Sequence, residues 1–370
     1  MRPDTLPATP GAATRRWRGV AVNLALLLGS LAIACLGLEG TVRLFDLELA
    51  SFHPIGAFCE YDEVLGWRLV PGRRGVFSKG GFSADVAISS QGLRDREYPL
   101  EKAAGRKRIL VLGDSVVWCW GVDMSDCFTE LVEERLPDTD VVALGVPGYG
   151  TAQELLAYER LGARFSPDLV ILVFVSNDPA ENLDGSVRPR FDLEDGGLVL
   201  RNVPVRRRKS RLKEWLSGHS RVYVQVNHAL QVGRQILKSA RRKVAPQAER
   251  PYMPLPPEQE VAAFDLTAAL LRRLRDEVSS DGACLLVVLD SLGRSDRQRL
   301  GSFCAEEDVP CLDLHPRLEQ AAAAGRRLTL AGDPHFSPQG HRVVADAIIE
   351  HLRGAPALCP APGASVPRAR

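Results

Sequence analysis

Four short stretches, far apart in the chain, carry residues that together could transfer an acyl group. Ser115 ends a Gly-Asp-Ser sequence after an apolar run, where its hydroxyl could act as a nucleophile. Asp333 and His335 lie much later, and such a carboxylate could orient an imidazole that takes the serine proton. Asn177 follows another apolar run, and its side-chain amide could hydrogen-bond a developing oxyanion.

Each stretch alone has a simpler explanation. Asp-Ser is an ordinary turn or helix N-cap, an Asn often stabilises its own turn, and an Asp-Pro turn can carry a solvent-exposed histidine. The fourth stretch, Leu144–Thr151, is rich in glycine, which lets the backbone turn tightly and bring an N–H close to a ligand. Whether these residues are catalytic or only structural therefore depends on whether the fold brings the four stretches together.

The order of the predicted elements supplies that common position. From Arg106 onward, apolar runs alternate with helix-like segments, which indicates βαβ units and a parallel sheet. The predicted strands are Arg108–Leu112, Val141–Leu144, Leu169–Val175, Cys284–Leu289 and Cys311–Leu314. The predicted helices are Ser125–Leu136, Ala152–Arg164, Glu258–Ser279, Arg297–Glu307 and Pro338–Leu352.

Five strands with helices on both faces predict a flavodoxin-like three-layer α/β/α sandwich. The serine follows the first strand, the glycine-rich turn the second and Asn177 the third, while Asp333 and His335 precede the last helix. Because the carboxyl ends of parallel strands meet at one edge of the sheet, we expect all four stretches to converge there. No Gly-x-Gly-x-x-Gly and no P-loop sequence follows any strand, which argues against a nucleotide-binding site.

This combination resembles the SGNH/GDSL hydrolase family, whose active site lies on four short sequence blocks. Gly-Asp-Ser115 matches the first block, Asn177 the third, and Asp333 with His335 the last. The glycine of the second block falls best on Gly148, with Gly145 as the other candidate. The resemblance covers roughly residues 106–352 apart from one insertion.

The resemblance implies a role for each matched residue. Ser115 is expected to be the nucleophile, His335 the base and Asp333 the carboxylate that orients it. The backbone N–H groups of Ser115 and Gly148, with the Asn177 amide, are expected to form the oxyanion hole. No metal and no cofactor is implied.

The sequence departs from the family pattern at three points. The last block reads Asp-x-His, whereas many members carry Asp-x-x-His, and the closer spacing resembles the membrane-associated, polysaccharide-modifying branch that includes alginate-acetylation proteins. Ala143 stands where the second block often begins with Asn, and Val175 replaces the glycine of the third block. None of these changes removes an atom that the chemistry needs.

An apolar run from Gly19 to Leu38 predicts a transmembrane helix, because twenty helical residues span roughly 30 Å. Arginines precede the run and Glu39 follows it, so the positive-inside rule places residues 1–18 in the cytoplasm. The rest would lie outside the inner membrane of a bacterium, in the periplasm if it is Gram-negative. A signal peptide cleaved after an Ala-x-Ala site and lipid modification of Cys35 are alternatives, and both also export the body of the protein.

Two segments flank or interrupt the hydrolase-like domain, which we place at 106–353. Residues 39–105 are punctuated by Gly and Pro, with short alternating stretches that predict a β-rich stalk or cap packed on that domain. Residues 179–257 are predicted to be a basic helical insertion, and residues 354–370 a disordered tail.

The insertion concentrates positive charge. Residues 201–243 hold thirteen Lys and Arg against one acid, and apolar side chains including Trp215 follow at a spacing that permits amphipathic helices. Such a segment is typical of binding to a membrane surface or an acidic polymer, and the alternative is a solvated insertion beside a core helix. Nucleic acid is a poor partner for an exported protein.

Composition adds few constraints. The chain has 370 residues, an ordinary apolar content and a formal net charge of +1. Its eight cysteines show no Cys-x-x-Cys and no zinc-type Cys/His spacing, which argues against a structural metal site. Cys119 and Cys127 flank the loop of the serine, and we hypothesise a disulfide between them.

We therefore expect a membrane-anchored, extracytoplasmic serine esterase that cleaves acetyl or other acyl esters, carried by a glycan or a lipid, through an acyl-enzyme. One alternative is a polysaccharide O-acetyltransferase with the same residues, because nothing in the sequence separates water from a sugar hydroxyl as acceptor. The other alternative is a non-catalytic anchored scaffold for glycan assembly that binds through Arg206–Arg208.

Overall fold

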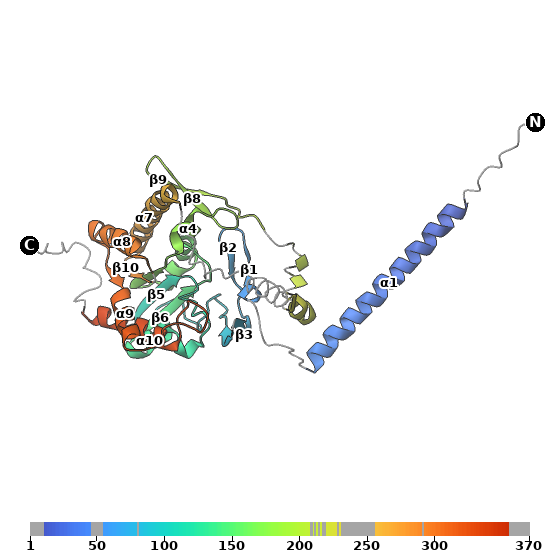
Figure 1. The fold of residues 1–370 in the computed structure, drawn as a ribbon, viewed down its shortest axis with the longest axis horizontal. Helices are drawn as coiled ribbons and strands as arrows, with labels where there is room; N and C mark the ends of the chain where they lie inside the picture. Colours follow the sequence, from blue (N-terminus) through green and yellow to red (C-terminus); the bar gives the residue numbers. More distant parts are fainter. Residues whose placement is uncertain are drawn as a thin grey trace, which may run out of the picture.

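The centre of the molecule is a five-stranded, wholly parallel sheet (Figure 1). The computed structural model describes residues 11–45, 55–79, 81–207, 256–290 and 292–354, with shorter stretches between 210 and 230. The strands are β5 (Lys107–Gly113), β6 (Thr139–Gly145), β7 (Leu169–Phe174), β10 (Cys284–Leu289) and β11 (Cys311–Asp313). They lie in the order β11-β10-β7-β5-β6. This order is 2-1-3-4-5 along the chain, so the predicted flavodoxin-like fold is confirmed.

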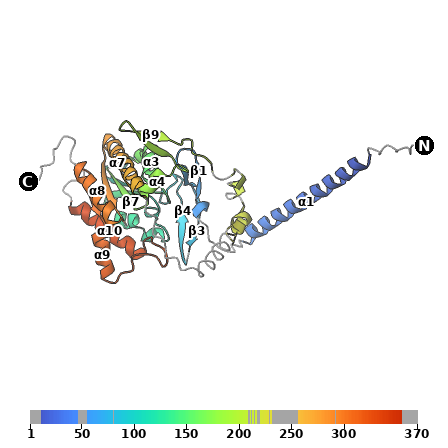
Figure 2. The ribbon, with the colours of Figure 1, turned by 45° about the horizontal axis from the view of Figure 1, so that its top comes forward.

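Helices cover both faces of the sheet, and alternating strand residues explain why. Val111 packs toward α2 (Phe128–Arg135), α9 (His315–Ala323) and α10 (Pro338–Gly354). Its neighbours Leu110 and Leu112 pack toward α3 (Thr151–Arg160), α7 (Pro257–Ser280) and α8 (Arg294–Glu306). Because both faces are buried, the strands read as continuous apolar runs, which is what made them predictable. Figure 2 shows the three layers from a second direction.

The amino-terminal segment forms two antiparallel strand pairs that belong to the core of the α/β domain. The pairs are β1 (Cys59–Asp62) with β2 (Gly66–Leu69) and β3 (Arg74–Lys79) with β4 (Phe82–Ala87). Phe58, Leu69 and Phe77 are buried in one hydrophobic cluster with Trp118, which follows the central strand β5. The predicted β-rich segment is therefore present, and of the two predicted forms, a stalk or a cap, it packs on the α/β domain as a cap does.

The insertion is partly the basic helical segment that the sequence predicts, because the described residues between 212 and 230 are mostly helical, but a hairpin precedes them. It begins with the short helix α4 (Asp178–Leu183) and continues into an antiparallel hairpin, β8 (Arg190–Glu194) and β9 (Gly197–Arg201). Phe191 of β8 is buried in the core, because the hairpin lies against α7. Much of the basic stretch beyond it lies outside the described residues, as do residues 355–370, where a disordered tail was predicted.

One long helix, α1 (Gly11–Leu44), stands apart from the α/β domain (Figures 1 and 2). Its section Gly19–Leu44 is long and apolar enough to cross a membrane, a test that a signal sequence also passes. The helix begins before the predicted residue 19 and continues beyond the predicted end at Leu38. Near its end, Glu39 accepts hydrogen bonds from the Ser220 hydroxyl and the Arg221 N–H of the insertion.

Candidate active site

The serine lies in a tight turn at the carboxyl end of β5. The Asp114 carboxylate accepts the Val116 N–H at 2.9 Å, and the Asp114 carbonyl accepts the Trp118 N–H at 3.0 Å. Gly145, at the end of the neighbouring strand β6, allows this turn to approach. A Cβ on Gly145 would lie 2.4 Å from the Trp118 nitrogen, so any other residue would push the turn away.

Ser115, His335 and Asp333 form a continuous hydrogen-bonded chain. The Ser115 Oγ is 2.8 Å from His335 Nε2, and His335 Nδ1 is 2.5 Å from Asp333 Oδ1. His335 and Asp333 lie in the loop before α10. Ser337 caps this helix by accepting the Gly340 N–H at 3.2 Å. Three residues predicted from two distant stretches are thus brought together in the geometry that a serine nucleophile requires.

Lys79 and the backbone reinforce the charge of the carboxylate. Burial alone would raise the pKa of Asp333, but hydrogen bonds from the His335 side chain and N–H and from Lys79 outweigh it. The pKa of Asp333 therefore lies below its usual value, and the group is ionised at neutral pH. An ionised partner favours the imidazole tautomer that keeps its proton on Nδ1 and leaves Nε2 to accept one from Ser115.

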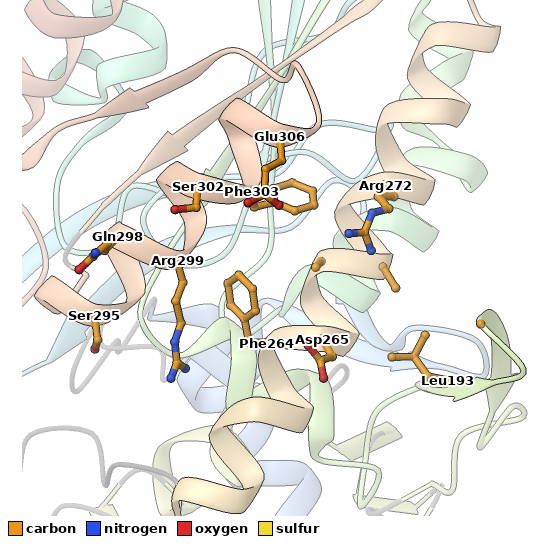
Figure 3. A pocket seen from close by; sticks show the side chains of 13 residues that line it. Leu193, Phe264, Asp265, Arg272, Ser295, Gln298, Arg299, Ser302, Phe303 and Glu306 are labelled. Atoms are coloured by element: carbon orange, nitrogen blue, oxygen red, sulfur yellow. The ribbon is translucent and has the colours of Figure 1, made fainter.

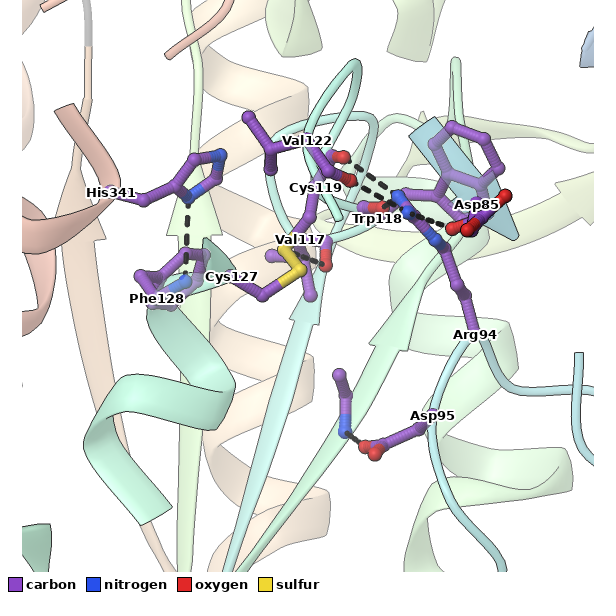
Figure 4. The surroundings of a disulfide bond; sticks show 11 residues. Asp85, Arg94, Asp95, Val117, Trp118, Cys119, Val122, Cys127, Phe128 and His341 are labelled. Carbon is purple, nitrogen blue, oxygen red and sulfur yellow. Dashed lines mark hydrogen bonds between the residues drawn. A yellow bond between two sulfur atoms is a disulfide. The ribbon is translucent and has the colours of Figure 1, made fainter. Parts of the chain in front are cut away.

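Aromatic and basic side chains hold the loop that follows the serine (Figure 4). The ring of Trp120 stacks on His335 with centroids 4.9 Å apart. The buried Arg94 guanidinium donates to the carbonyls of Trp118, Cys119 and Val122, each at 2.7 Å. Burial lowers the pKa of Arg94 to about 10, so the guanidinium stays charged at neutral pH.

A disulfide closes the same loop. It joins Cys119 to Cys127, whose Cα atoms are 5.6 Å apart, as hypothesised from the sequence. A second disulfide joins Cys304 to Cys311, between α8 and β11. The serine is thus placed by a strand, a buried cation and a covalent cross-link.

The predicted oxyanion donors lie around the serine turn. Asn177 follows β7, and its side chain hydrogen-bonds the Asp114 carboxyl next to the serine. Gly148 lies in the turn after β6 with a left-handed backbone (φ +79°), which favours glycine. Among the described residues, neither the Gly148 N–H nor the Ser115 N–H has a protein acceptor.

Behind Asn177 lies a cluster of acids that sequence patterns did not indicate as a group. Glu154 and Asp178 are almost wholly buried, and burial together with mutual repulsion raises the pKa of each well above its usual value. Burial also raises the pKa of Glu181 to about 7. Asp178 holds the turn by accepting the Val175 N–H at 3.0 Å.

Within the residues that the structure describes, neither a metal-binding cluster nor the cavity between α7 and α8 lies at the serine. Within the part of the chain that the structure describes, no three His, Cys, Asp or Glu residues are grouped to hold a metal ion. A cavity of about 730 Å³ between α7 and α8 is lined by Phe264, Arg272, Arg299 and Phe303, among others (Figure 3). None of the residues that line it belongs to the serine, histidine and aspartate chain.

Lys79 and Arg94 are the two contributors that sequence reasoning missed. Both lie in the β-rich segment, whose function could not be read, and their partners are remote in the chain. His341 is buried against the ring of Phe128 and is structural.

Comparisons with known proteins place this geometry in a family. A family model described as GDSL-like lipase/acylhydrolase matches residues 111–343, more than half of the chain. A search of curated proteins found no match.

Solved structures are similar at low identity. A lipolytic G-D-S-L family member from Veillonella parvula is 14% identical, with a TM-score of 0.37, and the match covers 67% of this chain and 100% of that one. A two-domain esterase active on acetylated mannans is 14% identical, with 67% and 49% covered and a TM-score of 0.38. An acetylxylan esterase from Geobacillus stearothermophilus is 14% identical, with 68% and 96% covered and a TM-score of 0.39. From the family match, the chain belongs to the GDSL-like lipase/acylhydrolase family, and its class of activity is the hydrolysis of ester bonds.

Proposed function

We propose that this protein is a membrane-anchored serine esterase that cleaves acetyl or other acyl groups from a glycan or a lipid outside the cytoplasm. The observation that carries the proposal is the hydrogen-bonded chain from Ser115 Oγ through His335 to Asp333. A chance surface cluster would not join a serine, an imidazole and an ionised carboxylate in this order at the carboxyl edge of a parallel sheet.

The reaction follows from the positions of these atoms. His335 Nε2 takes the proton of Ser115 as Oγ attacks the acyl carbonyl carbon, and Asp333 stabilises the charged imidazole. The oxyanion is held by the N–H groups of Ser115 and Gly148 and by the Asn177 amide. His335 then gives the proton to the leaving alcohol. Water attacks the acyl-enzyme with the same base, which releases the acid and restores the serine.

We place the catalytic domain at the outer surface of a bacterial inner membrane, with α1 as a single span. The exposed apolar surface of Gly19–Leu44 and the arginines before it support this orientation. The insertion lies at the end of α1, where Ser220 and Arg221 bond to Glu39, and Trp215 and Leu230 expose most of their side chains nearby in the chain. A basic segment with exposed Trp and Leu suits the headgroup region of an anionic membrane. Acylated glycans and lipids are the esters that such a domain meets.

Labelling of the full-length protein with a fluorophosphonate probe tests the nucleophile. The wild type should be labelled and Ser115→Ala should not, while Ser176→Ala, a change at the same edge of the sheet, should label normally. Labelling of Ser115→Ala at the wild-type rate would overturn the mechanism. Acetate release from an acetylated glycan without any added acceptor separates hydrolysis from transfer, because a transferase would release little.

A further inference from the structure

The tip of the amino-terminal hairpin β3–β4 is seated on the loop that follows the serine. Lys79 and Phe82 are opposite each other in register at this tip. Phe82 fills the space beside Gly121, where a Cβ would lie 2.7 Å from the Phe82 ring. The packing of Phe82 therefore holds the hairpin against the loop independently of the contacts that Lys79 makes.

Lys79 touches both partners of the imidazole. Its Nζ is 3.0 Å from Asp333 Oδ2, the carboxylate oxygen that His335 does not use. The same Nζ lies 5.0 Å from the ring centroid of Trp120, which stacks on His335. The Asp333 side chain is 5% exposed and that of Lys79 is 51% exposed, so the lysine covers the outer oxygen of a buried carboxylate.

We propose that Lys79 is a positioning residue of the hydrolytic site, which holds the Asp333 carboxylate in register with His335 and sets the pH at which the imidazole becomes available as a base. Because Lys79 holds Oδ2 of Asp333, the carboxylate is less free to rotate away from His335 Nδ1. The ammonium also offsets part of the attraction between Asp333 and a protonated imidazole, which favours the neutral base. This inference rests on the proposed function.

Other charged groups face the imidazole from each element around it. Asp114, just after β5, attracts a protonated imidazole only in its ionised form, and burial raises the pKa of this carboxyl. His341 on α10 would repel it if charged, but burial lowers the pKa of His341 to about 3, so it is neutral in the working range. Lys79 is thus the cation on the hairpin side that opposes Asp333 and Asp114.

The test measures kcat/KM for p-nitrophenyl acetate as a function of pH in the full-length protein. Lys79→Met removes the charge at similar length, and Lys79→Arg keeps it. Lys102→Met is the matched control, because Lys102 pairs with Asp168 at 2.5 Å near the amino-terminal ends of the strands, away from the serine. A melting curve for each variant shows that it is folded.

We expect the acid limb of the Lys79→Met profile to move to higher pH by about half to one unit, a screened charge effect at a half-exposed site. Activity below the limb then falls roughly three- to tenfold, and Lys79→Arg restores the wild-type position. An unmoved limb in Lys79→Met, or an equal shift in Lys102→Met, would overturn the role of Lys79. A wild-type rate in Ser115→Ala would instead overturn the proposed function itself.

Discussion

Arg94 offers the sharpest test of how the serine loop is held. Its guanidinium is 4% exposed and makes four hydrogen bonds to carbonyls, three of them on the loop after the serine and one on Asp85. Arg94→Met keeps much of the volume but leaves these carbonyls without a donor. A buried carbonyl that loses its donor costs about 1–3 kcal/mol.

The net magnitude is smaller than the sum of four such losses. Removing the arginine also removes the cost of burying its charge, so we expect a net loss at the lower end of that sum, about 3–5 kcal/mol. For a domain of this size, that corresponds to a fall in Tm of about 6–20 °C. We also expect the folded Arg94→Met protein to react more slowly. A displacement of about 1 Å at the nucleophile can lower the rate about a hundredfold.

Urea unfolding and the fluorophosphonate labelling rate, both at a temperature where all variants are folded, measure the two effects. Arg96→Met is the control, since Arg96 is 47% exposed and pairs with Glu130 and Glu133 at the surface. Its loss should cost less than about 1 kcal/mol. The reasoning is refuted if Arg94→Met unfolds within 1 kcal/mol of the wild type, or if its folded form labels at the wild-type rate.

Three further changes test other parts of the site. Gly145→Ala should destabilise the fold by roughly 1–3 kcal/mol or more in urea unfolding, because its Cβ would meet the backbone of Trp118; equal stability would contradict the close approach. His341→Gln should remove an acid sensitivity. Burial holds the pKa of His341 in the folded protein at about 3, so the free energy of unfolding of the wild type falls by about 1.4 kcal/mol per pH unit as pH falls from about 6.5. Urea unfolding at several pH values should show a weaker pH dependence of this free energy for His341→Gln. Asn177→Ala should lower kcat for ester hydrolysis by about 10²–10³, and an unchanged kcat would exclude it from the oxyanion hole.

Much of the fold could be predicted because the sheet is buried on both faces. Its four longer strands contain apolar runs long enough to recognise, and β10 was predicted with its observed bounds. The short helices α4 and α9 and the hairpin β8–β9 were missed. They carry mixed polar and apolar residues, and their packing against α7 and α10 stabilises them more than local propensity does.

The serine, histidine and aspartate chain could be predicted because each residue follows or precedes a recognisable element. Lys79 could not be predicted, because its position depends on a hairpin that packs against a loop distant in sequence. Arg94 likewise lies in an irregular stretch, and nothing in its local sequence indicates that its partners are backbone carbonyls. The pairing of Cys119 with Cys127 was accessible only because the two cysteines flank the serine loop.

In the proposed membrane-anchored arrangement, the junction between α1 and the α/β domain limits where the enzyme can work. The chain between Leu44 and Ile55 connects α1 to the short turn Ile55–Ala57, and a stretch of that length spans at most about 40 Å. With α1 in a bilayer, the serine is confined to a thin shell above that bilayer. Esters that diffuse along the membrane are then met at a high effective concentration. A polymer anchored farther away is reached only where it approaches the bilayer, so the tether itself selects substrates by their position.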